Sequence, residues 1–192
     1  AIARLAELAG LSTPAAEAAM RRHIGVCYDV CHSAVEFEDP KASIEQLRTN
    51  GILIAKLQLS SALKVASIDR DSAAQLADFS EPVYLHQVVE RLSGSLRRFA
   101  DLPQALAQAG SATGAEWRVH FHVPVFLEQM ARFGTTQSFL SEILDLHRLD
   151  PISEHLEVET YTWDVLPASY RNVTLATAIA RELNWVKARL QP

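Results

Sequence analysis

The sequence has few of the residues that mark several protein classes. Two cysteines among 192 residues exclude a disulfide-stapled scaffold, and seven glycines and eight prolines exclude collagen-like and low-complexity chains. No apolar run reaches the roughly 18 residues that a membrane span needs, and the N-terminal stretch AIARLAELAG is too charged for a signal peptide. The net charge of −5 comes without a basic patch, which argues against a nucleic-acid partner. We therefore expect a soluble, cytoplasmic protein without a transmembrane segment.

Glycine-rich phosphate loops are also missing. Neither GxGxxG nor GxxxxGK followed by Ser or Thr occurs after an apolar segment, so the sequence does not support dinucleotide or P-loop nucleotide binding. The 48% hydrophobic and 21% charged residues are ordinary for a globular chain. Because the length fits one domain and no linker interrupts it, we predict a single domain over residues 1–192.

Four apolar, β-branched segments predict buried strands, with helical patterns between them. The strands are expected at 24–31, 52–59, 118–126 and 156–161, and the helices at 1–22, 39–47, 71–79, 102–108, 135–146 and 175–190. An alternating segment near 83–99, broken by Ser93-Gly94-Ser95, predicts an inserted β-hairpin. Strands that alternate with helices indicate an α/β fold with a parallel sheet.

Each predicted strand ends in residue types that bind metals or transfer protons. They are, in chain order, Asp29 with His32, Gln58, His120 with His122, and Glu157 with Glu159. Residues two apart on a strand share a face, so the paired histidines point the same way, as do the paired glutamates. The carboxyl ends of parallel strands meet at one rim, and carboxylates with imidazole suit Mn²⁺, Mg²⁺ or Zn²⁺. The pattern therefore predicts a metal or substrate site at this rim.

Each of these residues, taken alone, also has a structural interpretation. A single histidine is more often a hydrogen-bonded core or rim residue, and Glu157 is expected at a solvated edge. Cys27 and Cys31 are expected to be small buried apolar residues, because CYDVC lacks the CxxC spacing of a redox motif. His86 fits a lid or an exposed hairpin equally well, and Trp163 fits a pocket wall or the core. The prediction of a site therefore depends on the residues being found together.

Several of these segments resemble a known superfamily. Val26-Cys-Tyr-Asp-Val-Cys-His32 resembles the CxDxCH strand of the xylose-isomerase-like TIM barrels, which include sugar isomerases, sugar epimerases and endonuclease IV-type DNA-repair nucleases. Val158-Glu159-Thr160 resembles the strand that closes those barrels. The segments 84–88, 117–124 and 157–163 are similar to those of the Ebo-type metabolite-traffic proteins, in the EboE-like branch. The resemblance covers nearly the whole chain.

The resemblance implies a divalent metal, Mn, Mg or Zn, held by Asp29, His122 and Glu159. In this superfamily the metal polarises the oxygens of an open-chain sugar while a carboxylate takes the proton beside the carbonyl and an acid returns it. The resemblance implies that Glu159 is this base and that His32 is the second catalytic residue, which transfers protons. Substrate contacts are expected from His120, Gln58 and Trp163.

Gln58 departs from the family pattern, which has a histidine at the end of this strand. An amide oxygen is a weaker metal ligand than imidazole, so the multinuclear zinc chemistry of the nucleases has little support here. The expected function is therefore that of a sugar isomerase or epimerase acting on a small-molecule metabolite. The alternatives are a non-catalytic metabolite-binding or trafficking module and, less favoured, an endonuclease IV-like nuclease.

The resemblance also implies a barrel that this chain only half supplies. A TIM barrel needs eight βα units over about 250 residues. The four predicted units match the C-terminal half, so we expect a truncated chain whose N-terminal half is absent. Such a half has an incomplete site without a firmly bound metal. Its open sheet edges favour pairing, and we expect a homodimer through them.

Overall fold

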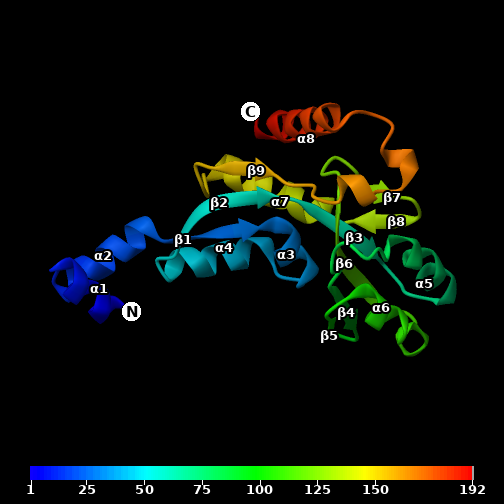
Figure 1. The fold of residues 1–192 in the computed structure, drawn as a ribbon, viewed down its shortest axis with the longest axis horizontal. Coiled ribbons are helices and arrows are strands. Elements are labelled where there is room, and N and C mark those ends of the chain that lie inside the picture. The colour runs from blue at the N-terminus through cyan, green and yellow to red at the C-terminus, as the bar shows by residue number, and fades with distance from the viewer. Residues whose placement is uncertain (192) are drawn as a thin grey trace.

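Two β-sheets, joined by one nearly continuous extended segment, organise the protein. The computed structural model describes residues 1–191. A parallel sheet has the order β1-β2-β9, with β1 at Gly25–Asp29, β2 at Leu53–Leu59 and β9 at Leu156–Val158. An antiparallel sheet has the order β5-β4-β6-β3-β8-β7. Only Ser60 separates β2 from β3 (Ser61–Val65), so the chain runs directly from the first sheet into the second (Figure 1).

The remaining strands belong to the antiparallel sheet. They are β4 (Val88–Leu92), β5 (Ser95–Phe99), β6 (Glu116–Val123), β7 (Gln129–Met130) and β8 (Phe133–Thr135). The predicted hairpin is confirmed over β4 and β5, and Ser93 and Gly94 both take positive φ in its two-residue turn. The hairpin is not a separate insertion, because β4 also pairs with β6.

Seven of the eight α-helices within residues 1–191 fall on predicted helical segments, whereas α3 begins inside the predicted strand 24–31. The helices are α1 (Ile2–Ala9), α2 (Thr13–His23), α3 (Val30–Val35), α4 (Pro40–Thr49), α5 (Arg70–Leu76), α6 (Leu102–Leu106), α7 (Gln137–Leu149) and α8 (Leu175–Leu190), with short 3-10 turns η1 (Ala77–Phe79), η2 (Ala109–Ser111), η3 (Trp163–Val165) and η4 (Ala168–Tyr170). Local caps set their starts: the Asp39 side chain accepts a bond from the Ala42 N–H at the start of α4, and Thr174 caps α8 in the same way. Among residues 1–191, no helix has the length and apolar character that crossing a membrane requires.

The prediction of four parallel strands is wrong for the segment 118–126. This segment forms β6, which pairs antiparallel with β3 on one side and β4 on the other, and β9 pairs directly with β2. Because β3 extends β2 through Ser60 alone, the chain leaves the parallel sheet there, and β6 pairs with β3 in the second sheet in the opposite direction. Three strands are therefore parallel, and within residues 1–191 the strands close no barrel.

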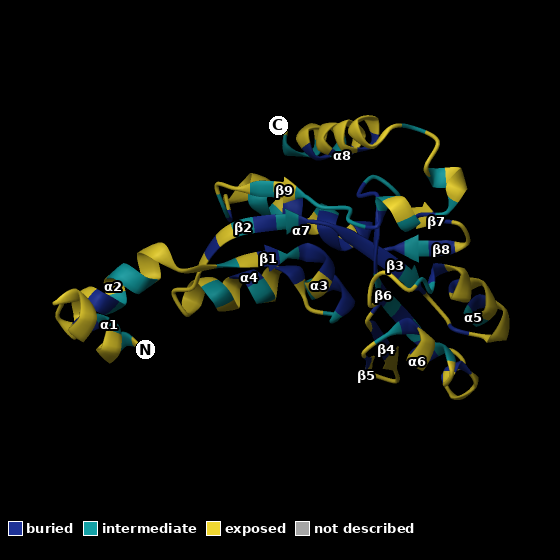
Figure 2. Ribbon diagram, in the orientation of Figure 1, coloured by how far each residue is buried: buried dark blue, intermediate teal, exposed yellow. Residues whose placement is uncertain are grey.

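The two larger of the three buried apolar clusters among the described residues correspond to the two sheets. One lies around Trp117 and Phe121 of β6, both fully buried. The other packs β1, β2 and β9 against α7 and α8, with Leu57 and Leu144 at its centre. Figure 2 shows buried residues concentrated along β2, β3 and α3, while α1 and α2 extend away from the body with mostly exposed side chains.

Candidate functional site

The parallel sheet has one apolar face and one polar face. Tyr28 pairs with Leu57, and both side chains belong to the core that the helices cover. Asp29 pairs with Gln58, which pairs with Glu157, so these polar side chains share the opposite face. The Glu159 N–H donates to the Leu59 carbonyl and continues this alignment past the end of β9. The predicted strand-end residues of these three strands therefore meet at one rim.

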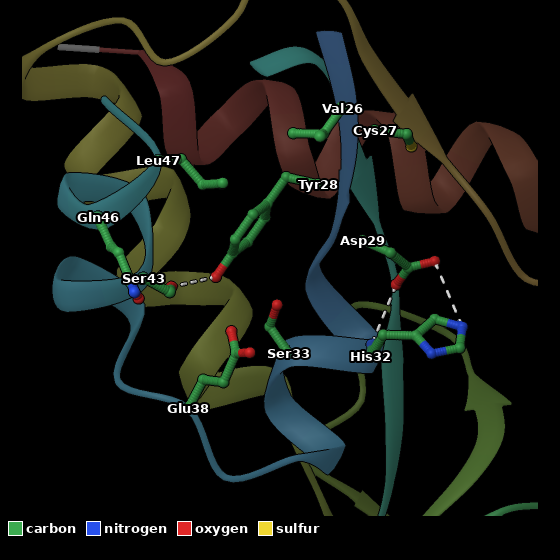
Figure 3. Close-up of a pocket in the computed structure, with 10 residues that line it drawn as sticks. All are labelled: Val26, Cys27, Tyr28, Asp29, His32, Ser33, Glu38, Ser43, Gln46 and Leu47. Atoms are coloured by element: carbon green, nitrogen blue, oxygen red, sulfur yellow. Dashed lines mark hydrogen bonds and ion pairs between the residues drawn. The ribbon is translucent and has the colours of Figure 1, made fainter. Parts of the chain in front are cut away.

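Asp29 joins β1 to α3 and holds the first turn of that helix. Its Oδ1 accepts hydrogen bonds from the His32 N–H at 3.1 Å and from Ser60 Oγ at 3.0 Å. Its Oδ2 lies 4.0 Å from Nε2 of His32, whose side chain is 55% exposed (Figure 3). The predicted strand 24–31 thus ends at Asp29, which places Cys31 and His32 on a helix because an N-capping aspartate starts it there.

Two histidines of β6 lie at the same rim, although β6 is antiparallel and not parallel as predicted. Because β3 continues β2, the antiparallel β6 runs back beside it, and His122 pairs with Ala62 just past the rim. The Nε2 atoms of His120 and His122 lie 3.2 Å apart, which confirms that the two rings point the same way. The His120 ring centroid is also 4.2 Å from that of His32.

Burial keeps the two β6 imidazoles neutral. Loss of solvent is the main cause that lowers the pKa of His122 to about 3 and that of His120 to about 4, and the neighbouring His32 ring contributes to the value of His120. Nδ1 of His122 lies 3.2 Å from the Glu159 carbonyl oxygen. A carbonyl only accepts, so Nδ1 carries the hydrogen and the Nε2 lone pair of His122 points toward His120.

Cys31 completes a group of three donors. It is fully buried in the first turn of α3, and one donor atom each from Cys31, His120 and His122 lies within 4.8 Å of the others. Burial raises the pKa of the Cys31 thiol well above its usual value. The prediction of a small buried residue is confirmed for Cys31 and wrong for Cys27, which is exposed on the polar face of the edge strand β1. The histidine neighbours of Cys31 were not predicted. No local sequence signal points to them, because only the packing of α3 against β6 brings the sulfur to the two imidazoles.

Aromatic side chains and a buried histidine surround the group. The Tyr161 ring is 4.2 Å from the His122 ring, and burial together with the nearby negative charge of Glu159 raises the Tyr161 pKa. Behind His120, the buried His86 places Nδ1 at 3.1 Å from the His120 carbonyl and Nε2 at 2.9 Å from Glu81. His86 therefore belongs to the wall of the site and not to an exposed hairpin.

The other predicted residues lie outside the group of Cys31, His120 and His122. Glu157 forms a surface ion pair with Lys56 at 2.8 Å, in accord with the solvated edge expected for it. The Gln58 amide oxygen accepts from the Cys27 thiol at 3.6 Å. Trp163 opens η3, packs against the Trp117 core and lines a separate pocket with Phe126 and Tyr170, so the structure does not bring it to the histidines.

A groove of about 410 Å³ runs along the free edge of β1 toward this rim (Figure 3). Tyr28 and Leu47 line one part of it, and Asp29 and His32 line the end nearest the histidines. Tyr28 Oη and Ser43 Oγ are 2.6 Å apart and tie the groove wall to α4. A small polar molecule in this groove would reach Asp29 and His32.

The oxygen-rich metal set that the sequence predicts is not the tightest donor group. Within residues 1–191, a single group of three or more metal-binding side chains with closely spaced donor atoms is present, and it consists of Cys31, His120 and His122. His122 belongs to it, whereas Asp29 and Glu159 lie outside it. The donors at this position are nitrogen and sulfur, which do not suit Mg²⁺ or Mn²⁺.

Comparisons with known proteins identify no relative. No family model matches the chain, and neither the curated proteins nor the solved structures contain a match. The superfamily resemblance and the roles it implies therefore remain predictions.

Proposed function

We propose that the protein binds a small polyhydroxy metabolite at the carboxyl ends of β1, β2 and β9 and moves a proton at the carbon beside its carbonyl, as a sugar isomerase or epimerase does. The observation that carries the proposal is the placement of two carboxylates, Asp29 and Glu159, and a half-exposed imidazole, His32, at one rim of a parallel sheet. Carboxylate and imidazole are the usual partners in such proton transfers.

In this proposal the groups have distinct roles. Glu159 takes the proton from the substrate carbon, and His32, positioned by Asp29, returns a proton to the intermediate. His120, whose ring burial keeps neutral and whose centroid lies 4.2 Å from that of His32, contacts a substrate hydroxyl. No step passes through a metal on Asp29 and Glu159, since these carboxylates do not form a donor group with His122.

The finer assignments belong to the same proposal and derive from the sequence resemblance. They are a xylose-isomerase-like barrel of which these three strands form part, a cytoplasmic Ebo-type role in metabolite traffic, and a homodimer. The polar face of the parallel sheet supports the first, because that face points inward in a closed barrel. β1 and β9 are the outer strands of the sheet and offer edges for pairing with a second copy.

Exchange of substrate hydrogen with solvent tests the reaction directly. The protein is incubated in deuterated water with aldoses, ketoses and their phosphates, and loss of the carbon-bound proton is followed by NMR. We expect Glu159→Gln to slow exchange by about 100-fold or more. Glu157→Gln is the matched control, because Glu157 lies on the same face two residues away but pairs with Lys56. Equal rates in the two variants would remove Glu159 from the mechanism.

A second candidate is a binding module without catalysis. Gln58 favours it, because its amide oxygen is already bonded to the Cys27 thiol and replaces the histidine of the family pattern. Saturable metabolite binding by calorimetry, together with no deuterium exchange for any substrate, would identify this alternative. The net charge of −5 continues to disfavour a nuclease.

A further inference from the structure

A sulfur and two imidazoles converge where three elements meet. Cys31 comes from α3, and His120 and His122 come from β6, which packs against that helix. The Cys31 N–H donates to Ser60 Oγ at 3.1 Å, and this hydroxyl in turn donates to Asp29. These bonds hold the Cys31 backbone at the junction of β2 and β3, next to Ala62, which pairs with His122.

The spacing of the donors is close to that of tetrahedral coordination. Zn–N bonds of about 2.0–2.1 Å and Zn–S bonds of about 2.3 Å place tetrahedral ligand atoms about 3.3–3.7 Å apart. The two Nε2 atoms are already 3.2 Å apart, and all three donors lie within 4.8 Å of one another. Side-chain adjustments of about 1 Å bring the sulfur to bonding distance.

The tautomer of His122 also suits a metal ligand. Its Nδ1–H donates to the Glu159 carbonyl, so Nε2 presents a lone pair to the centre of the group. Metal-binding histidines in proteins characteristically donate their second N–H to a carbonyl or carboxylate, which fixes the ring and its tautomer. Thr162 Oγ1 holds the same segment by donating to the His122 carbonyl.

We propose that Cys31, His120 and His122 bind one Zn²⁺ ion, with a fourth position left for water or a metabolite oxygen. A thiolate with two imidazoles selects zinc over Mg²⁺ and Mn²⁺, which prefer oxygen. Three protein ligands with one free position are typical of catalytic zinc sites and not of structural ones. This proposal differs from the oxygen-ligand metal of the sequence prediction and does not depend on the proposed proton transfer.

Zinc binding gives the buried group a net positive charge. The Cys31 thiol loses its proton to solvent and forms the Zn–S bond, while both imidazoles bind as neutral ligands. The complex then carries a charge of +1. Ser60 Oγ links Asp29 to the Cys31 N–H, and the Glu159 carbonyl contacts His122 Nδ1. The carboxylates of Asp29 and Glu159 therefore belong to residues that adjoin the group. These carboxylates offset the positive charge from outside the ligand set.

Metal titration of the intact chain tests the site without any substrate. The protein is stripped with chelator and titrated with Zn²⁺ by calorimetry and with Co²⁺ by absorption. We expect one ion per chain and a thiolate-to-cobalt charge-transfer band, which only a cysteine ligand produces. Cys31→Ser and His120→Asn are expected to weaken Zn²⁺ binding by more than the roughly 10–100-fold that loss of an outer partner costs.

Cys27→Ser is the matched control, since Cys27 is exposed and lies outside the group. It should bind Zn²⁺ and Co²⁺ as the unmodified protein does. The spectrum of the unmodified protein keeps the test valid if Cys31→Ser fails to fold. No binding, a cobalt spectrum without the thiolate band, or a loss in Asp29→Asn as large as in His120→Asn would overturn the proposal. Loss of exchange activity alone would not, which separates the metal site from the proposed reaction.

Discussion

The hydrogen bonds of the buried Glu182 carboxylate provide a quantitative test of how much the contact between α8 and the rim stabilises the fold. Glu182 is 2% exposed, and its Oε2 accepts hydrogen bonds from Thr160 Oγ1 at 2.7 Å and from the Val125 N–H at 3.3 Å. Thr160 follows Glu159, and Val125 follows the end of β6, so one oxygen links α8 to both segments that build the rim. Glu182→Ala removes the acceptor of the buried Val125 N–H and of the half-buried Thr160 hydroxyl.

Each unpaired buried donor costs about 1–3 kcal/mol. Because the bond to Val125 is long, we expect Glu182→Ala to lower the free energy of unfolding by about 2–4 kcal/mol. For a chain of this length this corresponds to a fall in Tm of about 5–15 °C. Glu182→Gln keeps an acceptor oxygen and should cost less than about 1 kcal/mol. Thermal and urea unfolding followed by circular dichroism measure both. Equal stability of the two variants would refute the link.

The pH dependence of the same residue has a defined sign. Burial raises the pKa of Glu182 above 4.5, so the folded state binds this proton more tightly than the unfolded state. The resulting stabilisation is present below the unfolded pKa and is lost as pH rises through the folded value. Relative to Glu182→Gln, the unmodified protein should therefore gain stability as the pH falls from 7 toward 4.5. A difference that is constant with pH would contradict this assignment.

Two further predictions concern contacts around β6. Trp117→Phe removes the fully buried indole N–H that donates to Glu90 at 2.8 Å. We expect the free energy of unfolding in urea to fall by about 1–3 kcal/mol. The control is Trp185→Phe, on the partly exposed face of α8, which should lower it by less than about 1 kcal/mol. Thr162→Val removes the hydroxyl that donates to the His122 carbonyl and should cost about 1–2 kcal/mol in the same assay; no loss would show that this carbonyl has another donor.

Local signals in the sequence account for most of the secondary structure. Asp39 before Pro40 predicts the start of α4, and Ser93-Gly94 between alternating segments predicts the turn from β4 to β5. These signals depend only on neighbouring residues, so they hold whatever the tertiary arrangement. The parallel pairing of β1, β2 and β9 is likewise predicted from short apolar runs separated by helices.

These local signals do not predict which strands pair when they are far apart in the sequence. The apolar pattern of β6 fits a buried parallel or antiparallel strand equally well, and its direction follows from β3, which the sequence interpretation overlooked. Ser60 and Ser61 look like the end of a strand, but both are fully buried, and Ser60 bonds to Asp29 and to the Cys31 N–H. The extended chain therefore continues through them into the second sheet.

The ends of the predicted strands indicate where the candidate site lies, but they do not indicate the group of Cys31, His120 and His122. Alternation along β6 predicts that His120 and His122 share a face, and this holds in an antiparallel strand as it does in a parallel one. Cys31 was missed because a buried cysteine has no local pattern that separates a packing role from a ligand. Only the crossing of α3 and β6 brings its sulfur to the two imidazoles.

The most direct test of the rim is a crystal of the intact chain soaked in Zn²⁺, with anomalous scattering recorded above and below the zinc edge. We predict one strong peak within bonding distance of Cys31 Sγ and the facing nitrogens of His120 and His122. A peak on the oxygens of Asp29 and Glu159 instead, or no peak among these side chains, would contradict it.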